Sequence, residues 1–236
     1  MNGHPSTAPP SHRIAAPAAI SKAVTLGETR WPAAIAVLVA SGVQMTLPQW
    51  VTLRPHWLLP ALELGLLAAL VASSPRRLER RSAALRAGGL TLAGLLSLAN
   101  ATSAALLVRD LAHGRADESA AALLLAGASI WAAGVLIFAL WYWELDRGGP
   151  ADRCHAMRMY PDFLFPQLQQ TGLAPPDWRP FFTDYLYLSF TNAISFAASD
   201  ITPLTRWAKA MMMLQSAVSV AAIVLVIARA VNIIGG

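Results

Sequence analysis

The chain has 236 residues, of which 56% are hydrophobic and only 13% are charged. About a quarter of the residues of a soluble domain are charged, so a soluble protein of this length would have too few polar side chains to cover its surface. The net charge of +5 raises nucleic acid as a partner, but the arginines lie in short clusters between apolar segments, a pattern typical of membrane orientation. Composition therefore predicts an all-α, polytopic transmembrane helix bundle, not a soluble enzyme or a nucleic-acid binder.

Residues 1–30 contain Pro5, Pro9, Pro10 and Pro17 among scattered basic residues. They have no compact apolar core followed by a cleavage site, so they do not resemble a signal peptide. We expect a flexible N-terminal tail on the cytoplasmic side.

Four apolar stretches follow, at about 31–47, 57–73, 87–108 and 120–143. A helix needs about 20 mainly apolar residues to cross a hydrocarbon layer about 30 Å thick. Residues 31–145 therefore predict a four-helix transmembrane region. Tryptophan and tyrosine lie at or near most of the expected ends, where such rings sit at the membrane surface.

One carboxylate lies inside the second stretch, at Glu63, three residues after Pro60. An ionisable group within a span is expensive and is a functional candidate by default. We expect this side chain to snorkel toward water near the outer surface. A buried proton site is the alternative.

Residues 146–180 form a long, proline-rich polar connection, predicted to be a cytoplasmic loop. Its segment 160–167 mixes aromatic residues with prolines, and we expect it to dock against the bundle, with a partner site as the alternative. Cys154 is the only cysteine, and its neighbour His155 does not by adjacency make a metal site. Glycine-rich phosphate loops, paired histidines and a nucleophile elbow are missing, so we predict no enzyme, no catalytic residue, no metal and no cofactor.

The last two apolar stretches, 181–199 and 208–234, predict a transmembrane hairpin over residues 181–236. Polar side chains spaced three or four apart give the first of these helices one polar stripe. The candidate polar pathway consists of Asn192, Ser195, Ser199 and Asp200, with Gln215 opposite. Helix packing through small and hydroxyl residues is the alternative role for both faces.

Basic residues are distributed unevenly between alternate loops, which predicts orientation. If the first span leaves the cytoplasm, the inner set is Arg13, Lys22, Arg30, Arg76, Arg77, Arg80, Arg81, Arg86, Arg147, Arg153, Arg158 and Arg179. The outer set is Arg54, Arg109, Arg115, Arg206 and Lys209. Six spans with both termini in the cytoplasm satisfy this bias.

The last fifty residues resemble a bacterial family of uncharacterised small integral membrane proteins, a domain of unknown function. The resemblance lies in DYLYLSFT at 184–191, SD at 199–200, QS at 215–216 and AVNI at 230–233. Members of that family have no established activity, so the resemblance implies a fold and no reaction.

Residues 187–191 and 199–203 are also similar to the pore-helix end and the post-filter segment of tetrameric potassium channels. Where those channels have Thr-Val-Gly-Tyr-Gly, this chain has SFAAS at 195–199. Ala197 and Ser199 replace the glycines that let backbone carbonyls line the ion path, so potassium selectivity does not carry over. The pore loop of those channels enters the membrane from outside. In this chain, the distribution of basic residues places the start of the corresponding segment on the cytoplasmic side. A full fifth span is therefore favoured, with five spans plus a re-entrant pore-like segment as the alternative.

The sequence thus predicts a non-enzymatic, multi-pass protein of a bacterial inner (plasma) membrane. The predicted function is channel-like passage of a small ion or solute, with Asp200 attracting cations at the mouth. The alternative is a non-conducting assembly or accessory protein. The expected partners are the lipid bilayer and, as an open option, further copies of the chain, with no nucleic acid.

Overall fold

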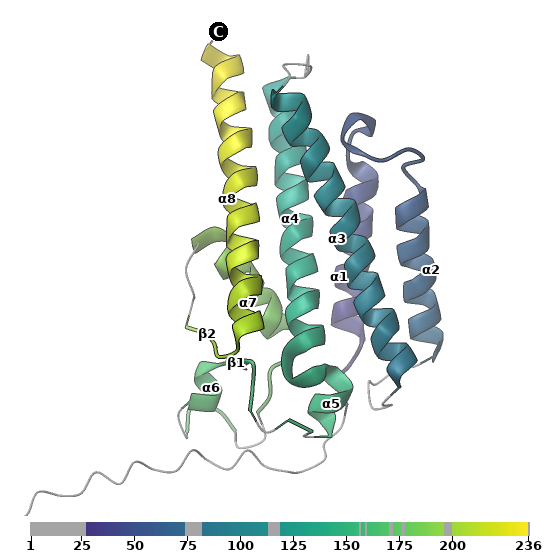
Figure 1. Cartoon of the computed structure of the whole chain (residues 1–236), viewed down its shortest axis with the longest axis vertical. Coiled ribbons are helices and arrows are strands. Elements are labelled where there is room, and N and C mark those ends of the chain that lie inside the picture. The colour runs from purple at the N-terminus through teal and green to yellow at the C-terminus, as the bar shows by residue number, and fades with distance from the viewer. Residues whose placement is uncertain are drawn as a thin grey trace, which may run out of the picture.

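The computed structural model describes residues 27–73, 82–112, 119–155, 157–158, 160–169, 172–175, 178–195 and 200–235. Most of these residues are α-helical, and the long helices run side by side along one axis (Figure 1). Three stretches of helix, Ala83–Asp110, Ala121–Gly148 and Arg206–Val224, are long and apolar enough to cross a membrane. They belong to α3 (Ala83–Ala112), α4 (Ala120–Leu145, with the short turn that follows) and α8 (Arg206–Gly235).

Two shorter apolar helices precede them, α1 (Trp31–Thr46) and α2 (Leu58–Ser73), linked through the 3₁₀ turn η1 (Gln49–Val51). Each has 16 residues, or about 24 Å of rise at 1.5 Å per residue. Proline in the first turn of α1 fits that position, because its missing N–H has no helical partner there. Five of the six predicted apolar stretches thus correspond to three long helices, α3, α4 and α8, and two shorter ones, α1 and α2.

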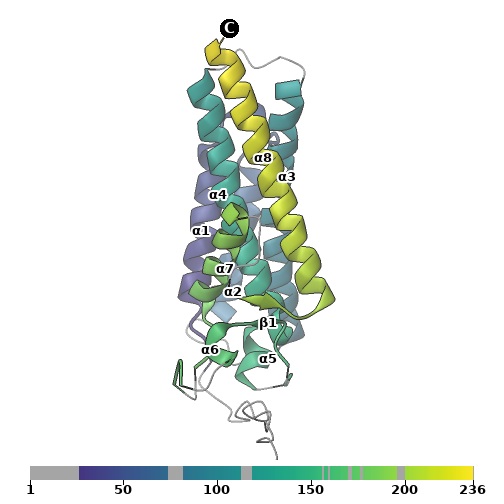
Figure 2. The same ribbon diagram turned by 90° about the vertical axis from the view of Figure 1, so that its left-hand side faces the viewer.

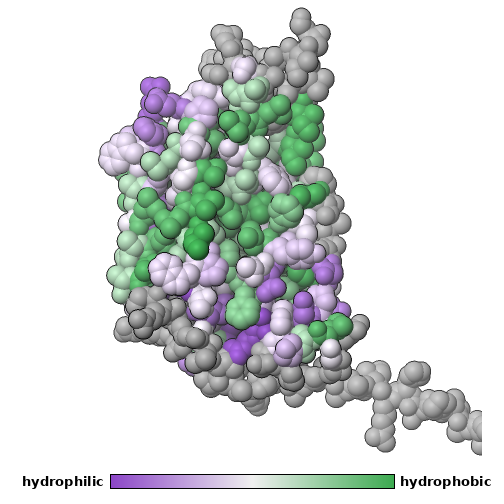
Figure 3. Space-filling model, turned by 180° about the vertical axis from the view of Figure 1, so that it is seen from behind, coloured by the Kyte–Doolittle hydropathy of each residue, from purple (hydrophilic) through white to green (hydrophobic). Residues whose placement is uncertain are grey.

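α4 lies at the centre of the bundle. It packs against α1 and α3 on one side, and against α7 (Phe182–Ser195) and α8 on the other. Its buried face includes Leu123, Leu140 and Tyr142, all exposed by 5% or less. On the outside, large apolar side chains such as Leu125 and Met213 are exposed, and hydrophobic residues gather over the middle of the surface (Figure 3). An apolar surface of this kind is typical of contact with lipid or with a partner.

α7 enters the bundle and does not reach its far end. It has 14 residues, about 21 Å of helix, and lies against α4 near one end of the bundle (Figures 1 and 2). After α7 the chain returns to the end from which it came, because β2 (Thr202–Pro203) pairs antiparallel with β1 (Phe163–Leu164), which precedes α7. The N–H of Leu204 also donates to the carbonyl of Asp162 (2.8 Å).

The described path after α7 fits the re-entrant alternative better than the predicted full crossing by residues 181–199. The apolar count ran on to residue 199, whereas the helix ends at Ser195 and the return is held by the strand pair. α8 begins at this same end and runs to the opposite one (Figure 1). Residues 27–30 and the end of α8 lie at opposite ends of the bundle (Figure 1), whereas six full spans would bring them to the same end.

The segment after α4 docks against the bundle, as expected. It contains the short helices α5 (Pro150–Cys154) and α6 (Pro166–Gln169) as well as β1. Phe163 and Phe165 are fully buried or nearly so, and their rings pack edge-on against Tyr142 and Tyr185. The N-terminal tail up to residue 26 and the arginine tract at 76–81 lie outside the described residues.

The re-entrant path predicts which positions are labelled from one side of a membrane. Met157 lies before α7 and Thr202 lies after it, and both positions are exposed. Each is replaced in turn by a single cysteine in a Cys154→Ala background. We expect a membrane-impermeant maleimide to label both from the same side of oriented vesicles, and a cysteine at exposed His56 from the other. Labelling of Thr202→Cys together with His56→Cys would show that α7 crosses.

Candidate functional site

The structure brings together two of the five predicted pathway residues. Asn192 and Gln215 are almost fully buried, and the Asn192 amide Nδ2 donates to Gln215 Oε1 (3.0 Å). Asp200 is exposed, Ser199 lies outside the described residues, and so does the side chain of Ser195. Only the Asn192–Gln215 pair can therefore be assessed as part of a site.

This pair belongs to a hydrogen-bond network that is closed within the protein. Gln215 Oε1 also accepts from the hydroxyl of Tyr142 (2.6 Å), and Gln215 Nε2 donates to the carbonyl and hydroxyl oxygens of Ser189 (2.9 and 2.7 Å). The Ser189 hydroxyl donates in turn to the carbonyl of Val135 in α4 (2.7 Å). A fully satisfied buried network makes a structure rigid, and this one fastens α7 and α8 to α4. The geometry favours the packing role, and passage of an ion or solute stays a prediction.

A second polar cluster lies where α4 ends, around the buried guanidinium of Arg153 in α5. Its Nε and Nη2 donate to the two carboxylate oxygens of Glu28 (2.8 and 3.1 Å). Its Nη1 donates to the carbonyls of Trp143 and Asp146 (2.6 and 2.9 Å). Burial alone would lower the pKa of Arg153, but the Glu28 carboxylate and the neighbouring Tyr185 and Asp146 raise it above its ordinary value. The cation is thus held in place on all sides.

The turn after α4 is fixed by two buried carboxylates. Asp146 accepts from the hydroxyl of Tyr185 (2.6 Å) and from the N–H of Asp162 (2.9 Å). Asp162 accepts from the N–H of Arg147 (2.8 Å) and from the indole of Trp207 (2.9 Å). Arg147 has a φ of 50°, a left-handed conformation that costs a residue with a Cβ about 1–2 kcal/mol. These bonds offset that strain and attach α7, the docked segment and α8 to the end of α4.

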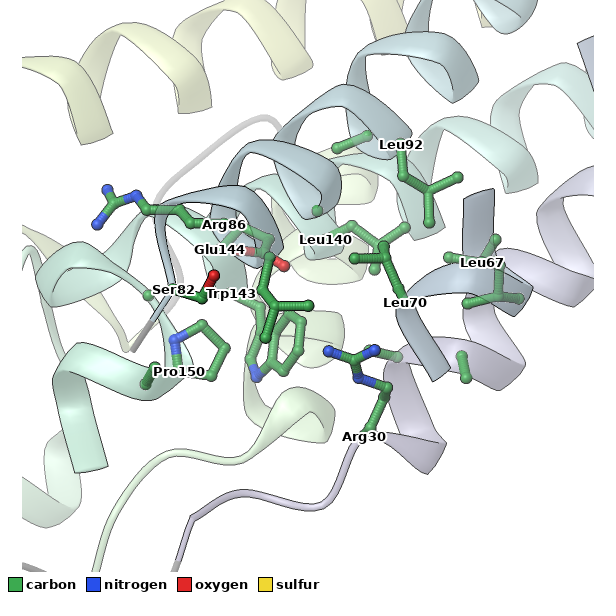
Figure 4. A pocket seen from close by; sticks show the side chains of 18 of the residues that line it. Arg30, Leu67, Leu70, Ser82, Arg86, Leu92, Leu140, Trp143, Glu144 and Pro150 are labelled. Carbon is green, nitrogen blue, oxygen red and sulfur yellow. The ribbon is translucent and has the colours of Figure 1, made fainter. Parts of the chain in front are cut away.

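A pocket of about 520 Å³ opens beside this junction, between α1, α2, α3 and α4 (Figure 4). That volume is within the range of about 300–1,000 Å³ found for small-molecule sites. One part of its wall is apolar, and includes Val37, Leu67, Leu70, Leu92 and Leu140. The other part is polar and includes Arg30, Ser82, Arg86, Glu144 and Asp152. A wall divided in this way suits an amphipathic molecule.

Two of the charged groups in the pocket have no direct bonding partner among the described residues. Arg86 is already engaged, because it donates to the carbonyl of Gly148 and lies 3.4 Å from an Asp152 oxygen. Arg30 Nη1, in contrast, is buried with no hydrogen-bond partner. Burial lowers the pKa of Arg30 below its ordinary value, and the Glu144 carboxylate opposes that shift. Among the described parts of the chain, no hydrogen bond or ion pair to the Glu144 side chain is found.

Glycine makes room for the Glu144 carboxylate at the pocket wall. A Cβ on Gly89 in α3 would collide with Glu144 Oε1, so the carboxylate lies directly against the α3 backbone. A Cβ on Gly88 would likewise meet the Leu70 side chain of α2 at 2.8 Å. Small residues let neighbouring helices approach closely. The adjacent glycines thus position both the acidic group and the apolar wall.

Sequence reasoning missed these pocket residues. Arg30 and Arg86 were counted only as orientation charges, and Glu144 was not singled out. An ionisable residue at the end of the most apolar stretch is a signal that could have found Glu144.

The expected position of Glu63 is also wrong. Its side chain is fully buried and accepts a hydrogen bond from Ser41 of α1 (2.6 Å). Snorkelling fails because α1 covers this face of α2 and offers a buried hydroxyl partner.

Comparison with known proteins finds no matching family model, no matching curated protein and no matching solved structure. The resemblances drawn from the C-terminal residues therefore remain expectations. The function has to be argued from the chemistry of the site.

The Arg153–Glu28 pair is expected to be essential for stability. In Glu28→Gln the Arg153 charge stays buried without its counter-ion, which costs about 3–5 kcal/mol. We expect a correspondingly large fall in the free energy of unfolding in detergent, followed by circular dichroism. The matched control is Asp200→Asn, which neutralises an exposed carboxylate and should change stability by less than about 0.5 kcal/mol. Equal effects of the two changes would contradict the assigned role of Glu28.

The closed network predicts that Gln215→Met destabilises the attachment of α7. The substitution leaves the Tyr142 hydroxyl and the Asn192 amide buried with fewer partners, at about 1–3 kcal/mol for each unsatisfied group. Limited proteolysis should then cut near α7 sooner than in the wild type. Leu214→Met, at an exposed neighbouring position, is the control and should leave the cleavage pattern unchanged. An unchanged pattern in Gln215→Met would mean that the network is not needed to hold α7.

Proposed function

We propose that the protein is a multi-pass inner-membrane protein that binds an amphipathic molecule. The preferred class is a lipid with a zwitterionic headgroup, which carries one anionic and one cationic group. This is a binding or accessory function, and it requires no conduction. The observation that carries the proposal is the pocket, whose apolar wall ends at two oppositely charged groups, Arg30 and Glu144. Within the described part of the chain, Arg30 Nη1 and the Glu144 carboxylate have no hydrogen-bond partner.

The proposed topology has five spans, α1 to α4 and α8, with α7 re-entering from the cytoplasmic side. In this arrangement the pocket, residues 146–180 and the start of α8 share the cytoplasmic end. Arg206 and Lys209 then move from the outer to the inner set of basic residues, which strengthens the positive-inside bias. The N-terminal end of α1 is inside and the end of α8 outside.

The chemistry of the pocket suits a headgroup with two charges. A guanidinium binds phosphate through charge-assisted, often paired hydrogen bonds, and Arg30 has an unused donor. Glu144 can accept from an ammonium group. Arg30 directly precedes α1 and Glu144 lies in α4, and both line the same cavity (Figure 4). A single zwitterionic headgroup can therefore satisfy both. The leucines of the wall then contact its acyl chains.

Channel-like passage past Asn192, Gln215 and Asp200 remains a separate prediction. The two amides are engaged within the protein, so we base the proposed function on the pocket. Flux in liposomes that equals the flux of empty vesicles would rule out conduction and leave the pocket proposal intact.

Lipid binding to the detergent-solubilised protein tests the proposal by native mass spectrometry. We expect phosphatidylethanolamine, with its N–H donors, to bind more tightly than phosphatidylcholine or phosphatidylglycerol. Arg30→Gln and Glu144→Gln should each weaken that binding about tenfold or more, since a hydrogen bond to a charged group contributes about 1.5–3 kcal/mol. Arg206→Gln, at an exposed position, is the charge-matched control. Equal binding of the three lipids, unaffected by either pocket variant, would refute the proposal.

A further inference from the structure

A separate polar cluster is buried between α1 and α2. It consists of Ser41, Gln44 and Glu63, which are exposed by 1%, 6% and 0%. The hydroxyl of Ser41 donates to Glu63 Oε2 (2.6 Å). Each of the three residues carries a side-chain oxygen atom, and none of them lines the amphipathic pocket.

Among the residues that the structure describes, this cluster lacks a complete set of hydrogen-bond partners. Glu63 Oε1 and both polar atoms of the Gln44 side chain are buried without a hydrogen-bond partner. The Gln44 amide lies close to the Glu63 carboxylate, but no hydrogen bond of ordinary length and angle joins the two side chains. Buried polar atoms are almost always partnered by protein, water or an ion. Several unpartnered atoms in one cluster therefore point to a ligand.

The described helices α1, α2 and α3 supply no counter-charge beside Glu63. Glu63 is the only charged residue of α2, and α1 has none. The charges of α3 are Arg86, Arg109 and Asp110, near its two ends. A buried carboxylate without a counter-ion is strongly disfavoured, so Glu63 must bind either a proton or a metal cation.

We propose that Ser41, Gln44 and Glu63 bind one sodium ion. The ligands are a Glu63 carboxylate oxygen, the Gln44 amide oxygen and the Ser41 hydroxyl oxygen, a hard, all-oxygen set. One carboxylate neutralises one monovalent charge, whereas a divalent cation would leave net charge in a site of low dielectric. Sodium binding replaces the carboxyl proton. The acid Glu63–COOH and Na⁺ give Glu63–COO⁻·Na⁺ and release one H⁺, so the site stays neutral in both states. The proposal does not depend on the lipid-binding function.

A hydrophobic carbodiimide tests the proposal, because it reacts with a protonated buried carboxyl and not with a metal-bound carboxylate. The full-length protein in detergent is treated with dicyclohexylcarbodiimide in sodium-free buffer, and the adduct is located by peptide mass spectrometry. We expect modification at Glu63 that sodium chloride slows at least tenfold. Potassium chloride and choline chloride at the same ionic strength should give little protection. Equal modification of Glu63 in sodium and choline would mean a permanently protonated carboxyl and would overturn the proposal, as would no modification without sodium.

Variants separate sodium binding from local stability. Gln44→Leu and Ser41→Ala keep Glu63 and should still be modified there, but with protection by sodium reduced at least tenfold. Val39→Ala, on the exposed side of α1, is the control and should retain full protection. Each variant is first checked for an unchanged elution profile and circular dichroism spectrum. Undiminished protection in Gln44→Leu and Ser41→Ala would overturn the ligand assignment even if Glu63 proved sodium-sensitive.

Discussion

The buried ion pair between Arg153 and Glu28 organises the end of the bundle at which most of the chain's connections meet. Taking two charges out of water is unfavourable, and it is tolerated only where further hydrogen bonds complete the pair. Here the extra bonds go to the carbonyls of Trp143 and Asp146 at the end of α4, a place where helix carbonyls run short of intrahelical donors. The same guanidinium lies 5.2 Å from the centre of the Tyr185 ring of α7. One side chain therefore caps α4, anchors the segment before α1 and supports the re-entrant helix.

The pocket follows from this junction. Glu28 binds both Arg153 and the indole of Trp143 (2.6 Å). These bonds bring Arg30, two residues further along the chain, to the end of α4. Arg30 consequently faces the cavity lined by Glu144 and is not left in solvent. The buried carboxylate of Asp146 then directs the chain away from the cavity, into the docked segment and α7. The charged end of the pocket and the path of the re-entrant helix are thus consequences of one set of buried bonds.

The sequence was sufficient for the long helices, because the length and apolarity of a run are local properties. It was insufficient for α7, since a two-residue strand pair and the contact of Trp207 with Asp162 have no periodic signal. The polar faces of the last two stretches place Asn192 opposite Gln215, and the two amides do meet. The sequence has no local signal that identifies Tyr142 as a further partner of Gln215. The number of basic residues in each loop predicts the orientation of the chain. It does not indicate which arginine is buried. One partner of buried Arg153, Glu28, lies 125 residues away in the sequence. The others are the carbonyls of Trp143 and Asp146, on the far side of a turn.

Hydrogen-bond satisfaction distinguishes the roles of two buried amides in this chain, Gln215 and Gln44. Polarity inside an apolar helix is expensive wherever it occurs, so position alone does not distinguish Gln215 from Gln44. Both amides are buried, but Gln215 bonds through both of its polar atoms to three neighbouring side chains, whereas Gln44 bonds through neither. The first arrangement is complete without a ligand and accounts for helix packing. The second leaves an energetic deficit that only a bound species or a proton can remove, and the same reasoning applies to Arg30 at the pocket.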